Sequence, residues 1–255
     1  MAGPLIALML IRPLCIVAAQ VGVAIFLGSW SATFPWWPFQ MIAANIVCAV
    51  LLFALSSRGE VPLRRIYLHP FVEGSATGKL GEFLKPKRFK HRALALVRDG
   101  ALFVGLLLAL GLPAIAAGRL VAEHLPVAIE SSKYAALPTW ALLSVTLLLP
   151  LTMPLVEVPW YFGYFFPRLE EALGASSRRP AVIAGAIVTA TYSLQHCLQP
   201  LALDAAFLAL RSVMLLPVLA LTALIIRLVP RFTPYILLLH AAMAIEVVTK
   251  YWAAS

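Results

Sequence analysis

Long apolar stretches dominate this sequence and limit the folds it can adopt. Seven of them approach or exceed the roughly 20 residues that an α-helix needs to cross about 30 Å of hydrocarbon. They cover approximately residues 4–28, 38–56, 100–118, 137–166, 180–200, 203–228 and 233–252. With 62% hydrophobic and only 12% charged residues, the chain is far more apolar than a soluble domain. We therefore expect an all-α, polytopic transmembrane bundle of seven helices, or eight if a short or re-entrant segment is added.

The expected organisation is a single transmembrane domain over residues 1–255. Two N-terminal helices fill residues 1–56, a basic loop follows at 57–99, and a C-terminal core spans 137–252. The first stretch has no basic segment before it and is interrupted only by Arg12 and Gln20. We therefore expect it to be a retained helix and not a cleaved signal.

The basic residues predict an orientation in the membrane. The 57–99 loop holds ten of the twenty Lys and Arg residues, so the positive-inside rule places it, and with it the N-terminus, in the cytoplasm. Further basic residues after the fourth and sixth stretches fall on the same side: Arg168, Arg178, Arg179, Arg227 and Arg231.

The net charge of +9 then reflects basic residues that orient the protein in the membrane. We expect these residues to bind anionic membrane lipids, not nucleic acid. Without a eukaryotic targeting signal, the expected location is the bacterial inner membrane. Nothing in the sequence determines the oligomeric state.

Among the ionisable residues inside apolar stretches, Glu157, His196 and His240 lie on three different stretches of the C-terminal core. Such groups are expensive at membrane depth and are functional candidates by default. Glu157 lies nine residues before Phe166, and His240 lies nine residues after Arg231, so both reach roughly 14 Å into the membrane from the basic side. His196 lies 16 residues beyond Pro180 and matches this depth only with a shifted boundary or a tilt. The three residues together predict one buried polar site.

A carboxylate and a histidine in a water-accessible cavity can jointly deprotonate a water molecule, and a second histidine can donate to an oxyanion. Such a trio would hydrolyse an amide within the membrane. Other interpretations are open: Glu157 could form a structural ion pair with Arg211, and the histidines could hydrogen-bond neighbouring helices. The trio could also bind zinc, although the HExxH arrangement is absent.

Three segments of the core resemble the CAAX protease and bacteriocin-processing (CPBP) family of glutamic-type intramembrane proteases, which includes the CAAX prenyl endopeptidases. The family's EExxxRG, FxxxH and HxxxN motifs correspond to EVPWYFG at 157–163, YSLQH at 192–196 and HAAMA at 240–244. FPRLE at 166–170 is also similar to the family, and the resemblance covers about residues 137–250.

The resemblance implies a CAAX-prenyl-endopeptidase-like fold. It also implies cleavage of a membrane-associated protein, such as a lipidated or C-terminally anchored one. We expect no cofactor. By this resemblance Glu157 and His196 would activate water, and His240 would stabilise the oxyanion.

The motifs depart from the family at four positions, one of which is Tyr192, an aromatic residue in place of the Phe of FxxxH. Val158, Phe162 and Ala244 stand where the family has a second Glu, an Arg and an Asn. The candidate replacements and supporting residues are Arg211, Asp204, Gln195, Gln199, Glu246 and Tyr192.

Two of these have simpler interpretations, Asp204 as a capping acid and Glu246 as the partner of Lys250 at i+4. Because several motif residues of the family are replaced, an alternative function is open: a catalytically inactive membrane scaffold or chaperone of the same fold. A small-molecule transporter is a third alternative, although inverted repeats are not evident in the sequence.

Overall fold

The computed structural model describes residues 2–58, 61–68, 70–71, 92–124, 134–174 and 178–255, and these residues form helices without a strand. The helices before the core are α1 (Ala2–Met9), α2 (Ile11–Leu27), η1 (Ser31–Trp36), α3 (Trp37–Ser57), α4 (Leu63–Leu68), α6 (Arg92–Leu106), η2 (Leu107–Gly111) and α7 (Leu112–His124). The core contains α9 (Thr139–Val158), η3 (Pro159–Phe165), α10 (Phe166–Ala172), α11 (Arg178–Cys197), α12 (Ala205–Leu228), η4 (Pro230–Phe232) and α13 (Thr233–Ala254). Most of the predicted basic loop, residues 72–91, lies outside the described residues.

Five helical segments are long and apolar enough to cross a membrane: Ala2–Leu27, Ser31–Ser57, Thr139–Ala172, Ala205–Leu228 and Pro230–Ala254. They coincide with the first, second, fourth, sixth and seventh apolar stretches of the sequence. The chain is therefore an all-helical integral membrane protein over its described residues, as the composition predicted. The other two stretches, 100–118 and 180–200, lie on α6 to α7 and on α11 and are not among these five.

Helix α11 is less apolar than its neighbours because its second half is rich in polar side chains. Thr189, Thr191, Ser193 and Gln195 lie there, and all four are buried. Polar residues of a membrane helix ordinarily face neighbouring helices, where they find hydrogen-bond partners. The polarity of α11 therefore marks the interior of the bundle.

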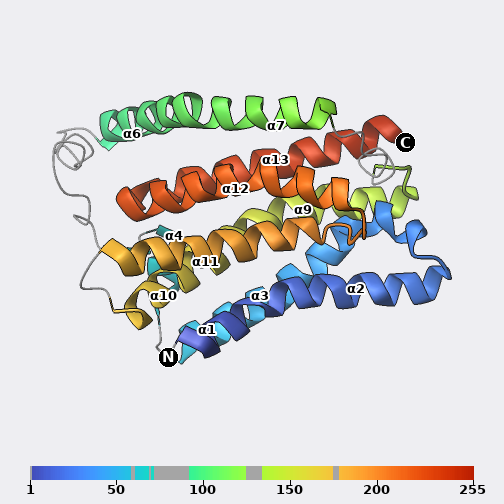
Figure 1. Cartoon of the computed structure of the whole chain (residues 1–255), viewed down its shortest axis with the longest axis horizontal. Helices are drawn as coiled ribbons and strands as arrows, with labels where there is room; N and C mark the ends of the chain where they lie inside the picture. Colours follow the sequence, from blue (N-terminus) through green and yellow to red (C-terminus); the bar gives the residue numbers. More distant parts are fainter. Residues whose placement is uncertain (1, 59–60, 69, 72–91, 125–133, 175–177) are drawn as a thin grey trace.

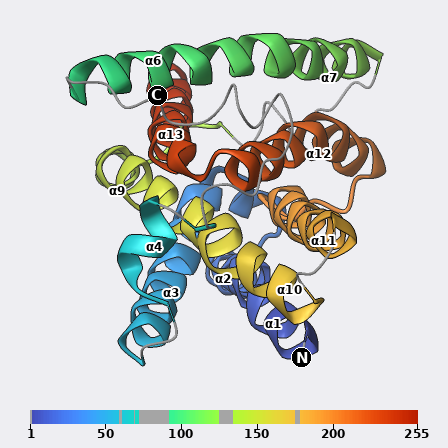
Figure 2. The same cartoon turned by 90° about the vertical axis from the view of Figure 1, so that its left-hand side faces the viewer.

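The long helices lie side by side along the long axis of the molecule, with the N-terminus at one end and the C-terminus at the other (Figure 1). Seen from its end, the bundle carries α6 and α7 along one side, next to α12 and α13, whereas α1 and α3 lie on the opposite side (Figure 2). The core between them contains the aromatic residues of η3, which are fully buried: Trp160, Tyr161, Phe162 and Phe165.

The helix that carries Glu157 changes its winding just after that residue. Pro154 and Pro159 lack the backbone N–H that an α-helix needs, and η3 is wound as a π-helix from Pro159 to Phe165. π-Helical turns are rare in proteins overall, and those that occur are often found at functional sites. This local geometry places Glu157, the penultimate residue of α9, at a junction in the middle of the bundle.

Gly163 allows η3 to approach α4 closely. A Cβ atom at this position would collide with the Ile66 carbonyl oxygen, whereas a Cβ at Gly105 of α6 would meet nothing within 4 Å. We expect Gly163→Ala to lower the free energy of unfolding by about 1–3 kcal/mol, because a backbone carbonyl cannot easily move away. Thermal unfolding in detergent measures this effect, with Gly105→Ala as the matched control. Equal stability of the two variants would contradict the close approach.

Several of the basic residues that were predicted to share one side of the membrane lie at the same end of the bundle. This end holds α10, the start of α11, the end of α12 and η4 (Figure 1). Two bidentate ion pairs join elements there: Arg227 donates to Glu170 at 2.7 and 2.6 Å, and Arg231 donates to Asp99 at 2.9 and 3.3 Å. Paired nitrogen donors fit a carboxylate especially well, so these contacts fix α12 against α10 and η4 against α6.

Candidate functional site

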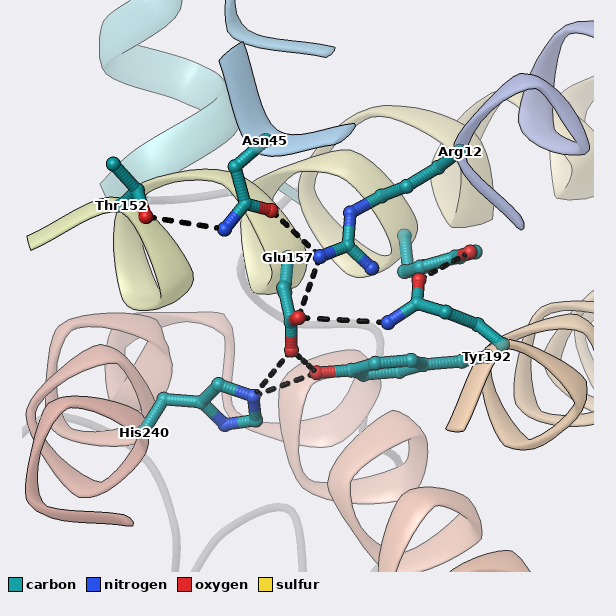
Figure 3. Close-up of polar contacts among 8 residues, drawn as sticks. Arg12, Asn45, Thr152, Glu157, Tyr192 and His240 are labelled. Carbon is teal, nitrogen blue, oxygen red and sulfur yellow. Dashed lines mark hydrogen bonds and ion pairs between the residues drawn. The ribbon is translucent and has the colours of Figure 1, made fainter. Parts of the chain in front are cut away.

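Glu157 is the centre of a buried polar network (Figure 3). Its Oε1 atom accepts from Arg12 Nη2 at 2.5 Å and from Gln195 Nε2 at 3.4 Å. Its Oε2 atom accepts from the Tyr192 hydroxyl at 2.7 Å and lies 3.0 Å from His240 Nε2. Since Glu157 is 0% exposed, every one of these contacts is made away from solvent.

Arg12 of α2 provides the charge that balances Glu157. The guanidinium is also 0% exposed, and its Nη2 atom donates to Asn45 Oδ1 at 2.6 Å as well as to Glu157. Asn45 of α3 in turn donates to Thr152 Oγ1 of α9 at 3.2 Å. A buried charge is tolerated only when it is paired and hydrogen-bonded, so this chain of contacts joins α2, α3 and α9 around the carboxylate.

Tyr192 of α11 connects the carboxylate to both histidines. Its hydroxyl oxygen lies 2.6 Å from His240 Nε2, so it bridges His240 and Glu157. Its ring stacks with His196 at 5.0 Å between ring centroids and with Tyr161 at 4.5 Å. The Tyr161 hydroxyl donates to Gln195 Oε1 at 2.8 Å, which orients the Gln195 amide toward Glu157.

The structure brings together most of the site residues that the sequence indicated. Glu157, Tyr192, Gln195 and His240 meet in direct contact, as expected for one buried polar site. His196 is next to this group through its stacking with Tyr192, and within the described residues its side chain has no hydrogen bond to Glu157.

The remaining candidates lie outside the network. Asp204 caps α12, accepting from the backbone N–H groups of Ala206 and Phe207 at 2.8 and 3.1 Å. Glu246 pairs with Lys250 at 2.7 Å, as its i+4 spacing predicted.

A structural ion pair was one alternative interpretation of Glu157, and Glu157 does form an ion pair, with Arg12. Arg211 lies over the ring of Phe207, 5.4 Å from the ring centroid, whereas the guanidinium that contacts Glu157 belongs to Arg12. Gln199 follows the end of α11, where its backbone N–H donates to the His196 carbonyl at 3.3 Å.

Reasoning from the sequence missed Arg12, Asn45 and Thr152. A signal for Arg12 was present, because an arginine within the first apolar stretch is as costly at membrane depth as Glu157. Two opposite charges that are buried in different spans are expected to form an ion pair with each other. Asn45 and Thr152 carry no comparable signal, since uncharged polar residues are common in membrane helices.

Zinc does not fit this arrangement of residues. Both carboxylate oxygens of Glu157 are engaged by neighbouring side chains, and a guanidinium nitrogen lies 2.5 Å from Oε1. A divalent cation placed on that carboxylate would be repelled by Arg12. Within the described residues, no group of three or more His, Cys, Asp and Glu side chains is arranged to hold a metal ion.

Comparisons of the chain with protein-family models, with curated proteins and with solved structures give no match. A carboxylate in direct contact with an imidazole and a phenol can accept, hold and return a proton.

Proposed function

We propose that this protein is an intramembrane endopeptidase related to the CPBP family. The observation that carries the proposal is the 3.0 Å contact between Glu157 and His240, two motif residues that are 83 positions apart. Tyr192, which begins the remaining motif, contacts both of them. Three segments that resemble one family in sequence order thus converge on a single carboxylate.

In this proposal Glu157 is the general base. It removes a proton from a water molecule whose oxygen attacks the carbonyl carbon of a peptide bond, and the carbonyl electron pair moves onto the oxygen. When the tetrahedral intermediate collapses, the C–N bond breaks and the proton passes to the amine that leaves. His196 assists the water and His240 donates to the oxyanion, in the roles that the family resemblance implies. The products are a carboxylate and an amine.

The same proposal includes the membrane arrangement. We take α6 to α7 and α11 as two further spans, giving seven. The N-terminus and the end of the bundle that holds α10, the end of α12 and η4 (Figure 1) then lie in the cytoplasm of a bacterial cell. The substrate is a membrane-associated protein with a lipidated or C-terminally anchored tail. It reaches Glu157 from the cytosolic side or laterally through the bilayer of the inner membrane, and no cofactor takes part.

One observation favours a second candidate, a catalytically inactive membrane scaffold. Glu157 is completely buried, and its ion pair with Arg12 links α9 to α2 and, through Asn45, to α3. A carboxylate with this environment can act only as a structural connection if water never reaches it.

A comparison of wild type with Glu157→Gln separates the two candidates. The amide keeps the shape of the side chain but cannot act as a base, so we expect cleavage to fall by at least about 100-fold. Proteomics of membrane-protein C-termini, with expression levels matched, identifies peptides that only wild type releases. Glu246→Gln is the control, since that carboxylate lies in an exposed pair with Lys250. Identical peptide sets from wild type and Glu157→Gln would leave the scaffold as the better explanation.

A further inference from the structure

The two sides of the Arg12 guanidinium are used differently. Nη2 donates one N–H group to Asn45 and the other to Glu157. Nε and Nη1 have no hydrogen-bond acceptor among the described residues, although the whole side chain is 0% exposed. Figure 3 shows Nη1 pointing away from Asn45 with no contact drawn to it. Three N–H donors of one cation are thus buried beside Glu157 without an acceptor.

Buried donors of this kind are rare and unfavourable, so they indicate an acceptor that belongs in the site. That acceptor is an oxygen atom, because guanidinium N–H groups match carbonyl and carboxylate oxygens. Nη1 and Nη2 share one carbon atom, so an oxygen bound to Nη1 lies beside the carboxylate that Nη2 holds. A peptide carbonyl bound there would lie next to the carboxylate that takes the proton from the attacking water.

The other candidate donor at this site is already engaged. His240 Nε2 lies 3.0 Å from Glu157 Oε2 and 2.6 Å from the Tyr192 hydroxyl. It must give up one of these contacts before it can donate to an oxyanion, whereas Arg12 Nη1 has no hydrogen bond among the described residues to give up. Among these groups, Arg12 is the charged donor with unused capacity next to Glu157.

We propose that Arg12 binds the carbonyl oxygen of the scissile peptide bond through Nη1 and stabilises the oxyanion formed from it. This inference rests on the endopeptidase function proposed above and adds to it a residue outside the three motifs. As the water oxygen bonds to the carbonyl carbon, the proton moves to Glu157 and the negative charge moves to the carbonyl oxygen. The positive charge of Arg12 then faces the oxyanion in place of the carboxylate, so the buried site stays electrically balanced throughout the step.

Arg12→Lys tests the assignment, because lysine keeps the positive charge and loses the planar pair of nitrogens. The assay uses purified protein in vesicles and a peptide that wild type cuts and Glu157→Gln does not. We expect kcat to fall about 100- to 1,000-fold with KM changed less than threefold, as on removal of an oxyanion donor. Arg119→Lys, at an exposed position on α7, is the control for the substitution itself.

The outcomes are distinguishable. A folded Arg12→Lys variant with wild-type kcat would show that Arg12 supplies only charge, and would overturn this inference while leaving the endopeptidase intact. A raised KM at unchanged kcat would also overturn it, since the contact would then be made equally in the ground state. If wild type and Glu157→Gln cleave nothing, the proposed function fails and this inference fails with it.

A binding measurement covers the case in which Arg12→Lys does not fold. The probe is a phosphinic peptide with the cleaved sequence, whose tetrahedral anion replaces the peptide bond. We compare Glu157→Gln with the double variant Arg12→Gln/Glu157→Gln, which leaves no unpaired charge. We expect the double variant to bind the probe at least about tenfold more weakly. Equal binding by the two proteins would contradict a role of Arg12 at the oxyanion.

Discussion

Arg12→Met is expected to lower the free energy of unfolding by about 3–5 kcal/mol, because it leaves the Glu157 carboxylate buried without its counter-charge. Arg12 and Glu157 are both 0% exposed and joined at 2.5 Å, so neither charge can turn to water when the other is removed. Methionine roughly preserves the length of the arginine stem, which limits the loss of packing. Denaturant titration of the purified protein in mixed micelles measures this change in the free energy of unfolding.

The double variant Arg12→Met/Glu157→Leu distinguishes an unpaired charge from lost packing. Removing both charges of a buried pair is often neutral or stabilising, so we expect the double variant to regain most of the stability that the single variant loses. Arg119→Met, at an exposed position on α7, should stay within about 0.5 kcal/mol of wild type. If the double variant is less stable than Arg12→Met, the contacts of Asn45 and Tyr192 in the network outweigh the ion pair.

The apolar stretches predicted the fold class because membrane depth imposes length and composition on a helix. The 137–166 stretch corresponds to α9 and η3, and the 203–228 stretch corresponds to α12. The prediction was less complete for α11, where buried polar residues replace apolar ones. Helix boundaries near Phe166 also shifted, because α10 continues the same helical segment to Ala172.

Counting residues from the basic end of each helix predicted that Glu157 and His240 lie at a similar depth. Glu157 and His240, each nine residues from such an end, are indeed in contact. His196 is deeper by this count, and the structure shows why the count was difficult there. Tyr192, one turn closer to the basic end of α11, is the residue of this helix whose side chain contacts both Glu157 and His240. His196 is one turn beyond it and stacks on its ring.

The partner of Glu157 could not be chosen from composition alone. Arg12 and Arg211 are both arginines within apolar stretches, and a sequence does not say which helix packs beside α9. In the structure α3 packs against both α2 and α9, so Asn45 can bind Arg12 and Thr152 together. Arg211 lies over Phe207, on its own helix. The choice between them was thus made by helix packing, which spacing does not encode.

Tyr192→Phe is expected to increase cleavage by about tenfold or more, because the Tyr192 hydroxyl occupies the position between Glu157 and His240. It lies 2.7 Å from Oε2 and 2.6 Å from Nε2, which are ordinary distances for a water molecule that bridges the same atoms. Phenylalanine, the residue of the family motif, would leave room there for a water that Glu157 can deprotonate. The measurement is the rate of peptide release by purified wild type and variant in vesicles at equal protein concentrations.

Two control variants are measured beside Tyr192→Phe. Tyr251→Phe removes another largely buried hydroxyl, one that donates to the Pro35 carbonyl at 2.8 Å, and should leave the cleavage rate unchanged. Tyr192→Phe/Glu157→Gln should be inactive, because the new water would have no base. A folded Tyr192→Phe variant with reduced cleavage would contradict the prediction and show that the phenol itself takes part in proton transfer. An increase would instead identify Tyr192 as the group whose hydroxyl occupies the position of the attacking water between Glu157 and His240.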